Sequence, residues 1–303
     1  MEDKILIFTS SYDKTCDYLI SKYKDSNFFR FNFDNFSSYR VTTSSDGFKI
    51  NGSYGNIDTN TCKSIYFRKP THENLDNIFD KKYLHFAHRE AYSLIEGITE
   101  SFDGTCLSKP SIMRKAGNKV SQAILAKKVG FSIPQLLITN DFTQVNKLKE
   151  KQSIVKPLSI GTVIEENKKE FVQTNMLNRD FDLESLKYTP AYFQEYIEKD
   201  FEVRVTFVGK KAFPVQIYSE NKVDWRKLDN NVKYSLCEIP NSIYNKCLDF
   251  LNLCEMQFGC FDLIVKDNIW YFLEMNSNGQ WAWLEFETGA CISEEIVGFL
   301  NGF

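Results

Sequence analysis

The 303-residue sequence contains no run of about 18 or more apolar residues, so it predicts no membrane-spanning helix. Its first residues are acidic and lack the basic and then apolar order of a signal peptide, which favours a cytoplasmic location. The eight cysteines form no C-x-x-C pair and the three histidines complete no zinc pattern, so we expect reduced thiols. The formal net charge of -3 argues against a broad nucleic-acid-binding surface.

The sequence also lacks the common fingerprints of nucleotide and hydrolase sites. It contains neither the P-loop pattern G-x-x-x-x-G-K-[ST] nor the dinucleotide pattern G-x-G-x-x-G, and it has no G-x-S-x-G nucleophile motif. Its composition, with 43% hydrophobic and 25% charged residues, is that of an ordinary globular protein. Its length is typical of about two domains or one large one.

Short apolar runs alternate with segments of helical periodicity, which predicts a mixed α/β fold. Asp13 is suited to cap the first helix. The order strand, helix, strand, strand, helix predicts a small α/β domain over residues 1–110. Later strand and hairpin patterns predict a central subdomain over 111–190 and a C-terminal subdomain over 191–303.

The most informative stretch is GCFDLIVKDNIWYFLEMNSNGQW, residues 259–281, which predicts a hairpin with a turn at Asp267-Asn268. Centred on Asn268, its register pairs Asp262 with Glu274, and a register one residue different separates them. Asn276 shares the face of Glu274, whereas Leu273 is expected on the other face. Two carboxylates and an amide are hard oxygen ligands that suit Mg²⁺. The alternative is an exposed hairpin with chance acids.

A bound anion would explain the positions of two lysines. Lys156 ends the apolar strand SIVKP, and Lys119 lies in the first turn of a helix, where the helix dipole disfavours a cation. Ser159, Gly161 and Thr162 could form a short phosphate-covering loop after Lys156. Either lysine alone could equally be a surface lysine.

The segment YFQEYIEKDFEVRVTF, residues 192–207, supplies further polar groups. We expect the backbone of residues 194–197 to read an adenine edge. Glu202 is suited to hold ribose hydroxyls, and Arg204 to stabilise a negative acyl phosphate. The alternative is a half-exposed strand with a cross-strand Glu/Arg pair.

In this order, these motifs resemble the ATP-grasp superfamily over roughly residues 110–285. They are N-K…G…P from Asn118 to Pro134, V-K-P, Q-E-Y-I, E-V-R-V, F-D-L and L-E-M-N. The resemblance implies ATP and Mg²⁺ as cofactors. It implies nucleotide contacts for Lys119, Lys156, Ser159, Gly161, Thr162, Gln194, Glu195, Tyr196, Ile197, Glu202 and Phe272, and metal ligation by Asp262, Glu274 and Asn276.

A narrower resemblance extends over nearly the whole chain. The ending EMNSNGQWAWLEFETG (residues 274–289), with F-R-K-P at 67–70 and V-D-W-R at 223–226, looks like the microviridin-type ATP-grasp maturases, the graspetide ligases. That resemblance implies a homodimer that binds a ribosomal precursor peptide, with a leader and a Thr/Glu-rich core. It implies that Glu or Asp side chains are phosphorylated and joined to Thr, Ser or Lys as macrocyclic esters or amides. Arg204 and Arg226 are the candidates for holding the acceptor carboxylate.

Two other functions fit some of the same residues. An ATP-grasp ligase that adds free amino acids, such as glutamate, to a protein or small molecule would share every ATP-binding residue. A non-catalytic module that binds nucleotide and peptide would be expected to lose a metal ligand or a lysine, and this sequence retains all five. The sequence predicts neither a membrane nor a nucleic acid as a partner.

Overall fold

The computed structural model describes residues 3–53, 55–146, 148, 152–159, 161–165, 168–172, 174–177, 183–221, 223, 225 and 230–302. The fold is mixed α/β, as the sequence predicts, and its strands form three larger sheets, a three-stranded meander and one separate hairpin. None of the helices among these residues combines the length and apolarity needed to cross a membrane.

The N-terminal part is built on a parallel sheet in the order β2-β1-β6-β7. Its strands are β1 (Lys4–Thr9), β2 (Phe28–Asn32), β6 (Cys62–Phe67) and β7 (Thr105–Cys106). An antiparallel meander flanks it: β3 (Arg40–Ser44), β4 (Gly47–Gly52) and β5 (Gly55–Asp58). The helices are α1 (Lys14–Lys22), the short η1 (Phe33–Ser38) and α2 (Lys81–Glu100). Asp13 caps α1 as predicted, since its carboxylate accepts from the backbone of Thr15 and Cys16.

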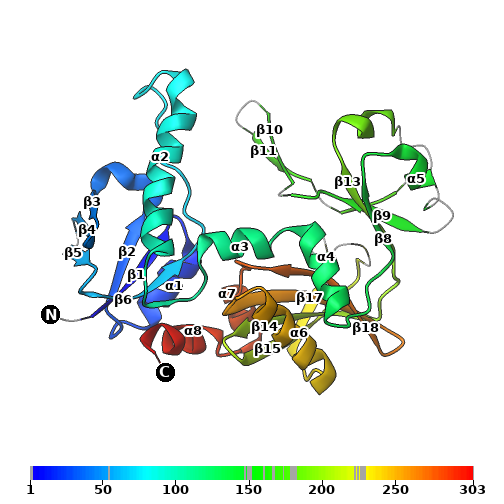
Figure 1. Cartoon of the computed structure of the whole chain (residues 1–303). Coiled ribbons are helices and arrows are strands. Elements are labelled where there is room, and N and C mark those ends of the chain that lie inside the picture. The colour runs from blue at the N-terminus through cyan, green and yellow to red at the C-terminus, as the bar shows by residue number, and fades with distance from the viewer. Residues whose placement is uncertain are drawn as a thin grey trace.

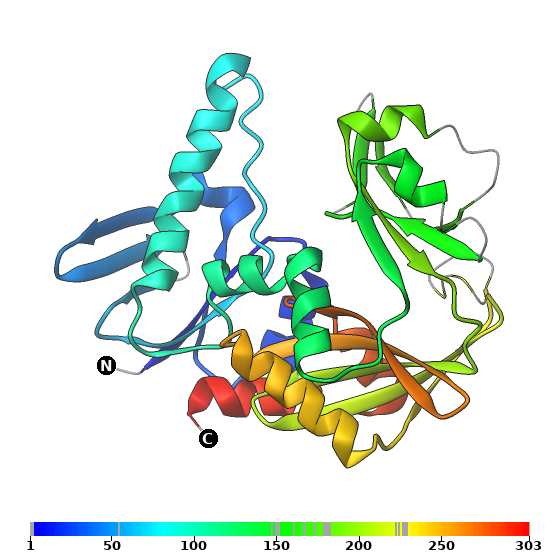
Figure 2. The ribbon, with the colours of Figure 1, turned by 45° about the vertical axis from the view of Figure 1, so that its right-hand side comes forward.

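The central part follows α3 (Pro110–Ala116) and α4 (Lys119–Lys128). Its antiparallel sheet has the order β12-β9-β13-β8. The strands are β8 (Leu136–Thr139), β9 (Ser153–Lys156), β12 (Asn175–Met176) and β13 (Ala191–Glu195). It also contains the β10 (Thr162–Glu165) and β11 (Lys168–Phe171) hairpin, α5 (Phe142–Asn146) and η2 (Glu184–Tyr188). Figures 1 and 2 show this part standing away from the rest, opposite the projecting α2.

The C-terminal part is an antiparallel sheet in the order β16-β15-β14-β17-β18. Its strands are β14 (Phe201–Val208), β15 (Lys211–Ser219), β16 (Val232–Leu236), β17 (Phe258–Lys266) and β18 (Ile269–Asn276). The helices are α6 (Asn241–Leu253), α7 (Ala282–Thr288) and α8 (Ile292–Asn301). One face of the sheet forms an apolar core with α6, through residues such as Val205, Phe250 and Phe261.

The opposite face of that sheet shares a core with the N-terminal part. Ile5 and Ile7 of β1 pack in one cluster with Trp281 and with Ile296 and Leu300 of α8. The first and last parts of the chain are therefore joined by buried apolar surface rather than by a linker. The boundaries expected near residues 110 and 190 stay predictions.

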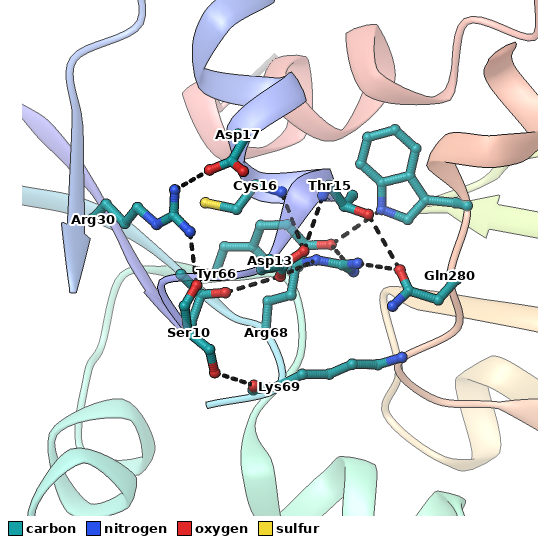
Figure 3. Close-up of polar contacts among 12 residues, drawn as sticks. Ser10, Asp13, Thr15, Cys16, Asp17, Arg30, Tyr66, Arg68, Lys69 and Gln280 are labelled. Carbon is teal, nitrogen blue, oxygen red and sulfur yellow. Dashed lines mark hydrogen bonds and ion pairs between the residues drawn. The ribbon is translucent and has the colours of Figure 1, made fainter. Parts of the chain in front are cut away.

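A buried arginine joins the same two parts through polar contacts (Figure 3). Arg68, just after β6, is fully buried, and its Nε lies 2.9 Å from Oδ2 of Asp13. Its Nη1 donates to the hydroxyl of Tyr66 at 3.2 Å, and its Nη2 donates to Oε1 of Gln280. Thr15 donates to the same Gln280 oxygen at 3.2 Å. The loop after β18 is thus fixed onto β6 and α1.

Replacing Arg68 by Met should lower the free energy of unfolding by about 3–5 kcal/mol, because the Asp13 carboxylate loses its buried counter-charge. Urea unfolding followed by circular dichroism measures the loss. Arg114→Met is the matched control, since the side chain of Arg114 is 65% exposed in its pair with Glu96 and should cost about 1 kcal/mol or less. Equal losses in the two variants would contradict the role given to Arg68.

Candidate active site

The hairpin of β17 and β18 brings the three predicted metal ligands together. Asp267 and Asn268 both have positive φ, 48° and 63°, as a tight two-residue turn requires. From the turn, pairs run from Lys266 with Ile269 to Leu263 with Phe272, and the register then shifts by one residue. Beyond the shift Asp262 pairs with Glu274, as predicted. The predicted register is therefore right at the site and wrong beside the turn.

The shift is a bulge at Leu273, and it changes which side chains face the cleft. Phe272, expected to contact nucleotide, is 2% exposed and packs against Phe131, Phe250 and Phe261 in the α6 core. Leu273, expected on the other face, lines the cleft with Glu274 and Asn276. A strict two-residue alternation does not hold across a bulge, so both expectations are corrected.

A buried ion pair fixes Asp262. Arg204 lies opposite Asp262 on β14, and its Nε and Nη2 donate to Oδ1 and Oδ2, each at 2.7 Å. Both side chains are buried. Burial alone would lower the pKa of Arg204, but the adjacent Asp262 outweighs it and the pKa is raised, so the guanidinium stays charged. The guanidinium also lies 5.8 Å from the ring centre of Trp283.

Asn276 lies between the two carboxylates. Its Nδ2 donates to Oδ2 of Asp262 at 3.0 Å and to Oε1 of Glu274 at 3.5 Å. Across the described part of the chain, no cluster of three or more His, Cys, Asp or Glu side chains could hold a metal by itself. Two carboxylates and an amide nevertheless fit Mg²⁺, which completes its coordination with water and substrate phosphates.

The two predicted lysines face these carboxylates from other elements. Lys119, at the start of α4, donates to the carbonyl of Pro157 at 2.8 Å and lies 3.8 Å from Oε2 of Glu274. Lys156, at the end of β9, lies 3.3 Å from Oε1 of Gln194 and 4.3 Å above the ring of Tyr192. Both lysines remain partly open to the cleft, which leaves fixed positive charge for an anion.

These groups line one cleft of about 640 Å³ between the central and C-terminal sheets. Nine of the predicted site residues are among its walls: Lys119, Lys156, Ser159, Gly161, Gln194, Glu202, Asp262, Glu274 and Asn276. The sequence reasoning missed eight others: Ile154, Pro157, Val172, Thr174, Lys199, Val223, Trp225 and Leu273. Of these, Lys199 forms an ion pair with buried Glu202. The two residues are three positions apart, so this pair could have been predicted from the sequence.

The remaining predicted residues are placed as follows. The N–H groups of Glu195 and Tyr196 donate to the carbonyls of Gln135 (2.7 Å) and Gln152 (2.9 Å). Residues before β8 and β9 therefore occupy these two donors, and the adenine contact expected of residues 194–197 stays a prediction. Thr162 begins β10 with its side chain outside the described residues. Arg226 lies outside the described residues altogether.

A second groove of about 520 Å³ adjoins this cleft and shares Lys119, Trp225, Glu274 and Asn276 with it. Its other walls include Lys69 from the N-terminal part and the loop 277–280 after β18. Trp283 also lines it, whereas Trp281 is fully buried and donates to the hydroxyl of Tyr66 at 3.3 Å. A substrate in this groove would lie beside Lys119, Glu274 and Asn276.

Gly161→Ala should weaken ADP binding about tenfold. A Cβ atom at Gly161 would lie 2.6 Å from Cγ of Pro157 and 2.8 Å from the carbonyl of Val172, so this wall of the cleft must shift. Titration calorimetry with ADP measures the effect. Gly97→Ala, on α2 with open space around the new Cβ, is the control and should bind ADP normally. Unchanged affinity in Gly161→Ala would argue against this wall contacting nucleotide.

Comparison with known proteins is consistent with this geometry. Residues 4–114 match the model of the MvdD pre-ATP grasp domain. The fold resembles a Chryseobacterium gregarium RiPP-associated ATP-grasp ligase, solved with ADP and a leader and core peptide, with a TM-score of 0.89. The two sequences are 27% identical, over 99% of this chain and 97% of that one.

Two further structures share the fold. Macrocyclase MdnC from Microcystis aeruginosa, bound with precursor peptide MdnA, has a TM-score of 0.88 at 23% identity, over 99% of this chain and all of that one. D-alanine–D-alanine ligase from Bacillus anthracis has a TM-score of 0.55 at 12% identity, over 91% and 87%. Curated protein sequences give no match. The match of residues 4–114 to an MvdD pre-ATP grasp domain, together with the shared fold over the whole chain, supports a graspetide-type ATP-grasp maturase.

Proposed function

We propose that this protein is an ATP-dependent peptide ligase. It phosphorylates Glu or Asp side chains of a ribosomally made precursor peptide and closes ester rings with Thr or Ser, or amide rings with Lys. The observation that carries the proposal is the shared wall of Lys119, Trp225, Glu274 and Asn276, which joins the cleft of cations and carboxylates to a second groove. One compartment suits a nucleotide and the other a carboxylate-bearing side chain.

The likeness to the Chryseobacterium ligase supports a peptide as the second substrate. That protein was solved with ADP and with a leader and core peptide, and this chain matches it over 99% of its own length. We infer a precursor with a leader and a Thr/Glu-rich core for this chain as well. An amino-acid ligase would need only a small second compartment, whereas this groove has about 520 Å³ and continues beside Lys69 toward Tyr12.

The chemistry needs ATP because an acid and an alcohol do not condense in water at useful yield. A carboxylate oxygen of the peptide attacks the γ-phosphorus, the bond to the β-phosphate oxygen breaks, and ADP leaves. The hydroxyl or amine then attacks the acyl carbon and gives up its proton, and inorganic phosphate leaves with its bonding electrons. Each ring therefore costs one ATP, and the peptide loses the elements of one water.

The charges of the cleft residues indicate which part of ATP each of them would contact. Lys119 and Lys156 offset the negative charge of the polyphosphate, and Ser159 and Gly161, with Thr162 at the start of β10, cover it. Gln194 to Ile197 border the adenine, and Glu202, held by Lys199, binds the ribose. Asp262, Glu274 and Asn276 would hold Mg²⁺, which supplies neutralisation of the β- and γ-phosphates when bound.

The two candidate arginines have different roles in the proposed enzyme. Arg204 is committed to Asp262 in a two-point ion pair, so its main effect is to position that carboxylate. Arg204 is also among the residues that line the second groove. Arg226 stays a candidate for the acceptor carboxylate, beside Trp225 in the sequence.

Mass spectrometry tests the reaction. Incubation with Mg²⁺-ATP and the Thr- and Glu-rich precursor encoded beside the gene should remove the mass of one water per ring, and only with ATP. Glu274→Gln should abolish the loss because one metal-binding oxygen becomes a nitrogen, while the fold is kept, since Glu274 is 23% exposed and outside the core. Glu238→Gln, exposed and away from the cleft, is the control.

Two results would contradict this function. An unmodified peptide, with ATP consumed only when a free amino acid is supplied, would indicate the amino-acid ligase. No ATP consumption under any condition would indicate a binding module. Full activity of Glu274→Gln would remove Glu274 from the metal site.

We also propose a cytoplasmic homodimer, with neither membrane nor nucleic acid as a partner. Support for the dimer comes from α2, which projects from the N-terminal part (Figure 1). It contributes to an apolar surface with Ile78 (67% exposed), Phe79 (47%), Tyr83 (50%) and Phe86 (63%). Apolar patches of this kind mark protein interfaces.

Phe86→Asp should convert the dimer to monomer, because a charge in an apolar interface loses its hydration. Sedimentation velocity measures the state. Ile124→Asp, equally exposed at 66% but on α4, is the control and should stay dimeric. A monomeric wild type, or a dimeric Phe86→Asp, would contradict this interface.

A further inference from the structure

Three cations line the groove beside the nucleotide cleft, and two of them are engaged. Lys119 donates to Pro157, and Arg204 is paired with Asp262. The third, Lys69, comes from the N-terminal part and lines this groove but not the nucleotide cleft. Its ammonium group makes no hydrogen bond or ion pair with any residue that the structure describes. It is therefore the cation of the groove that neither a described protein group nor the proposed polyphosphate engages.

The backbone aims Lys69 into this space. Its φ of 44° lies in the left-handed region, which is uncommon for a residue with a side chain. Ser10 holds the conformation, because its hydroxyl donates to the carbonyl of Lys69 at 3.1 Å and accepts from the N–H of Thr71 at 3.0 Å. The preceding Arg68 is fully buried. Figure 3 shows the Lys69 side chain extending toward the loop that carries Gln280. Strained backbone that neighbours hold in place is often found at functional sites.

We propose that Lys69 binds the reacting carboxylate of the peptide's Glu or Asp side chain, in a subsite of this groove next to Glu274 and Asn276. This inference rests on the proposed function, because it assigns a position to the acidic side chain that is phosphorylated. An ammonium group contributed to the groove by the N-terminal part would draw the carboxylate toward Glu274 and Asn276, at the boundary with the nucleotide cleft. It would also offset the repulsion between that carboxylate and the polyphosphate.

The surroundings set the charge of Lys69. Burial in the groove is the largest effect, and it lowers the pKa of Lys69 to about 8. The positive charges of Arg68 and Arg204 also lower this pKa, whereas Asp13 and Cys260 raise it. The ammonium is charged below that pH and loses its proton above it. A carboxylate keeps its charge throughout this range, so binding that depends on Lys69 should weaken as the pH rises through about 8.

A binding cycle tests the subsite without turnover. The precursor peptide is prepared in two forms, with its core Glu residues intact or changed to Gln, and each is titrated into wild type and Lys69→Met with ADP present. We expect Lys69→Met to bind the acidic peptide about tenfold more weakly, the loss of one charge-assisted hydrogen bond. The amide peptide should bind both proteins alike. Lys63→Met, on the same sheet but away from the groove, should behave as wild type.

Lys69→Arg keeps a positive charge that does not titrate, and it should retain affinity without the loss above pH 8. Equal affinity of wild type and Lys69→Met for the acidic peptide would overturn the subsite, as would an equal loss for both peptides. Failure of the proposed function is recognised separately, because the wild-type enzyme would then leave the peptide unmodified. In that case the subsite falls with it. Normal ADP binding by Lys69→Met shows that the variant is folded.

Discussion

The nucleotide-facing side of the C-terminal sheet depends on one irregularity, the bulge at Leu273. The two-residue turn starts the hairpin in a register that would put Glu274 on the side of the α6 core. The bulge turns Glu274 and Asn276 back toward Asp262 while Phe272 and Met275 stay in that core. Two carboxylates side by side would repel, and the buried Arg204 next to Asp262 makes the arrangement tolerable. The lysines across the cleft leave the assembled site ready for a polyanion.

The N-terminal part completes this site rather than sitting beside it. Arg68 fixes the loop after β18 through Gln280, and Lys22 pairs with Glu285 of α7 on the same side. The long motif at residues 274–289 therefore has two structural roles. Its first residues face the cleft, and its later ones bind the N-terminal part. That division explains why its Trp281 is buried while Trp283 borders the groove.

The sequence predicts what short-range patterns control. Asp13 caps the helix that its position indicates, the strand SIVK forms β9, and the hairpin turns at Asp267 and Asn268. It does not predict the bulge, since nothing in the alternation of β18 marks Leu273 as the extra residue. The same holds for the backbone donors of Glu195 and Tyr196, which are occupied by residues distant in sequence. Lys69 was visible only as part of a motif, because its position depends on how two parts of the chain pack.

The central claim is that the cleft uses ATP to activate a carboxylate held in the adjoining groove. Its most direct test is oxygen transfer from peptide to phosphate. A precursor peptide whose acidic side chains carry a heavy oxygen isotope is incubated with the enzyme and ATP, and the released inorganic phosphate is examined by mass spectrometry. The account predicts one heavy oxygen in the phosphate for each ring formed, because the acyl phosphate breaks at the acyl carbon. Ring formation with unlabelled phosphate would contradict it.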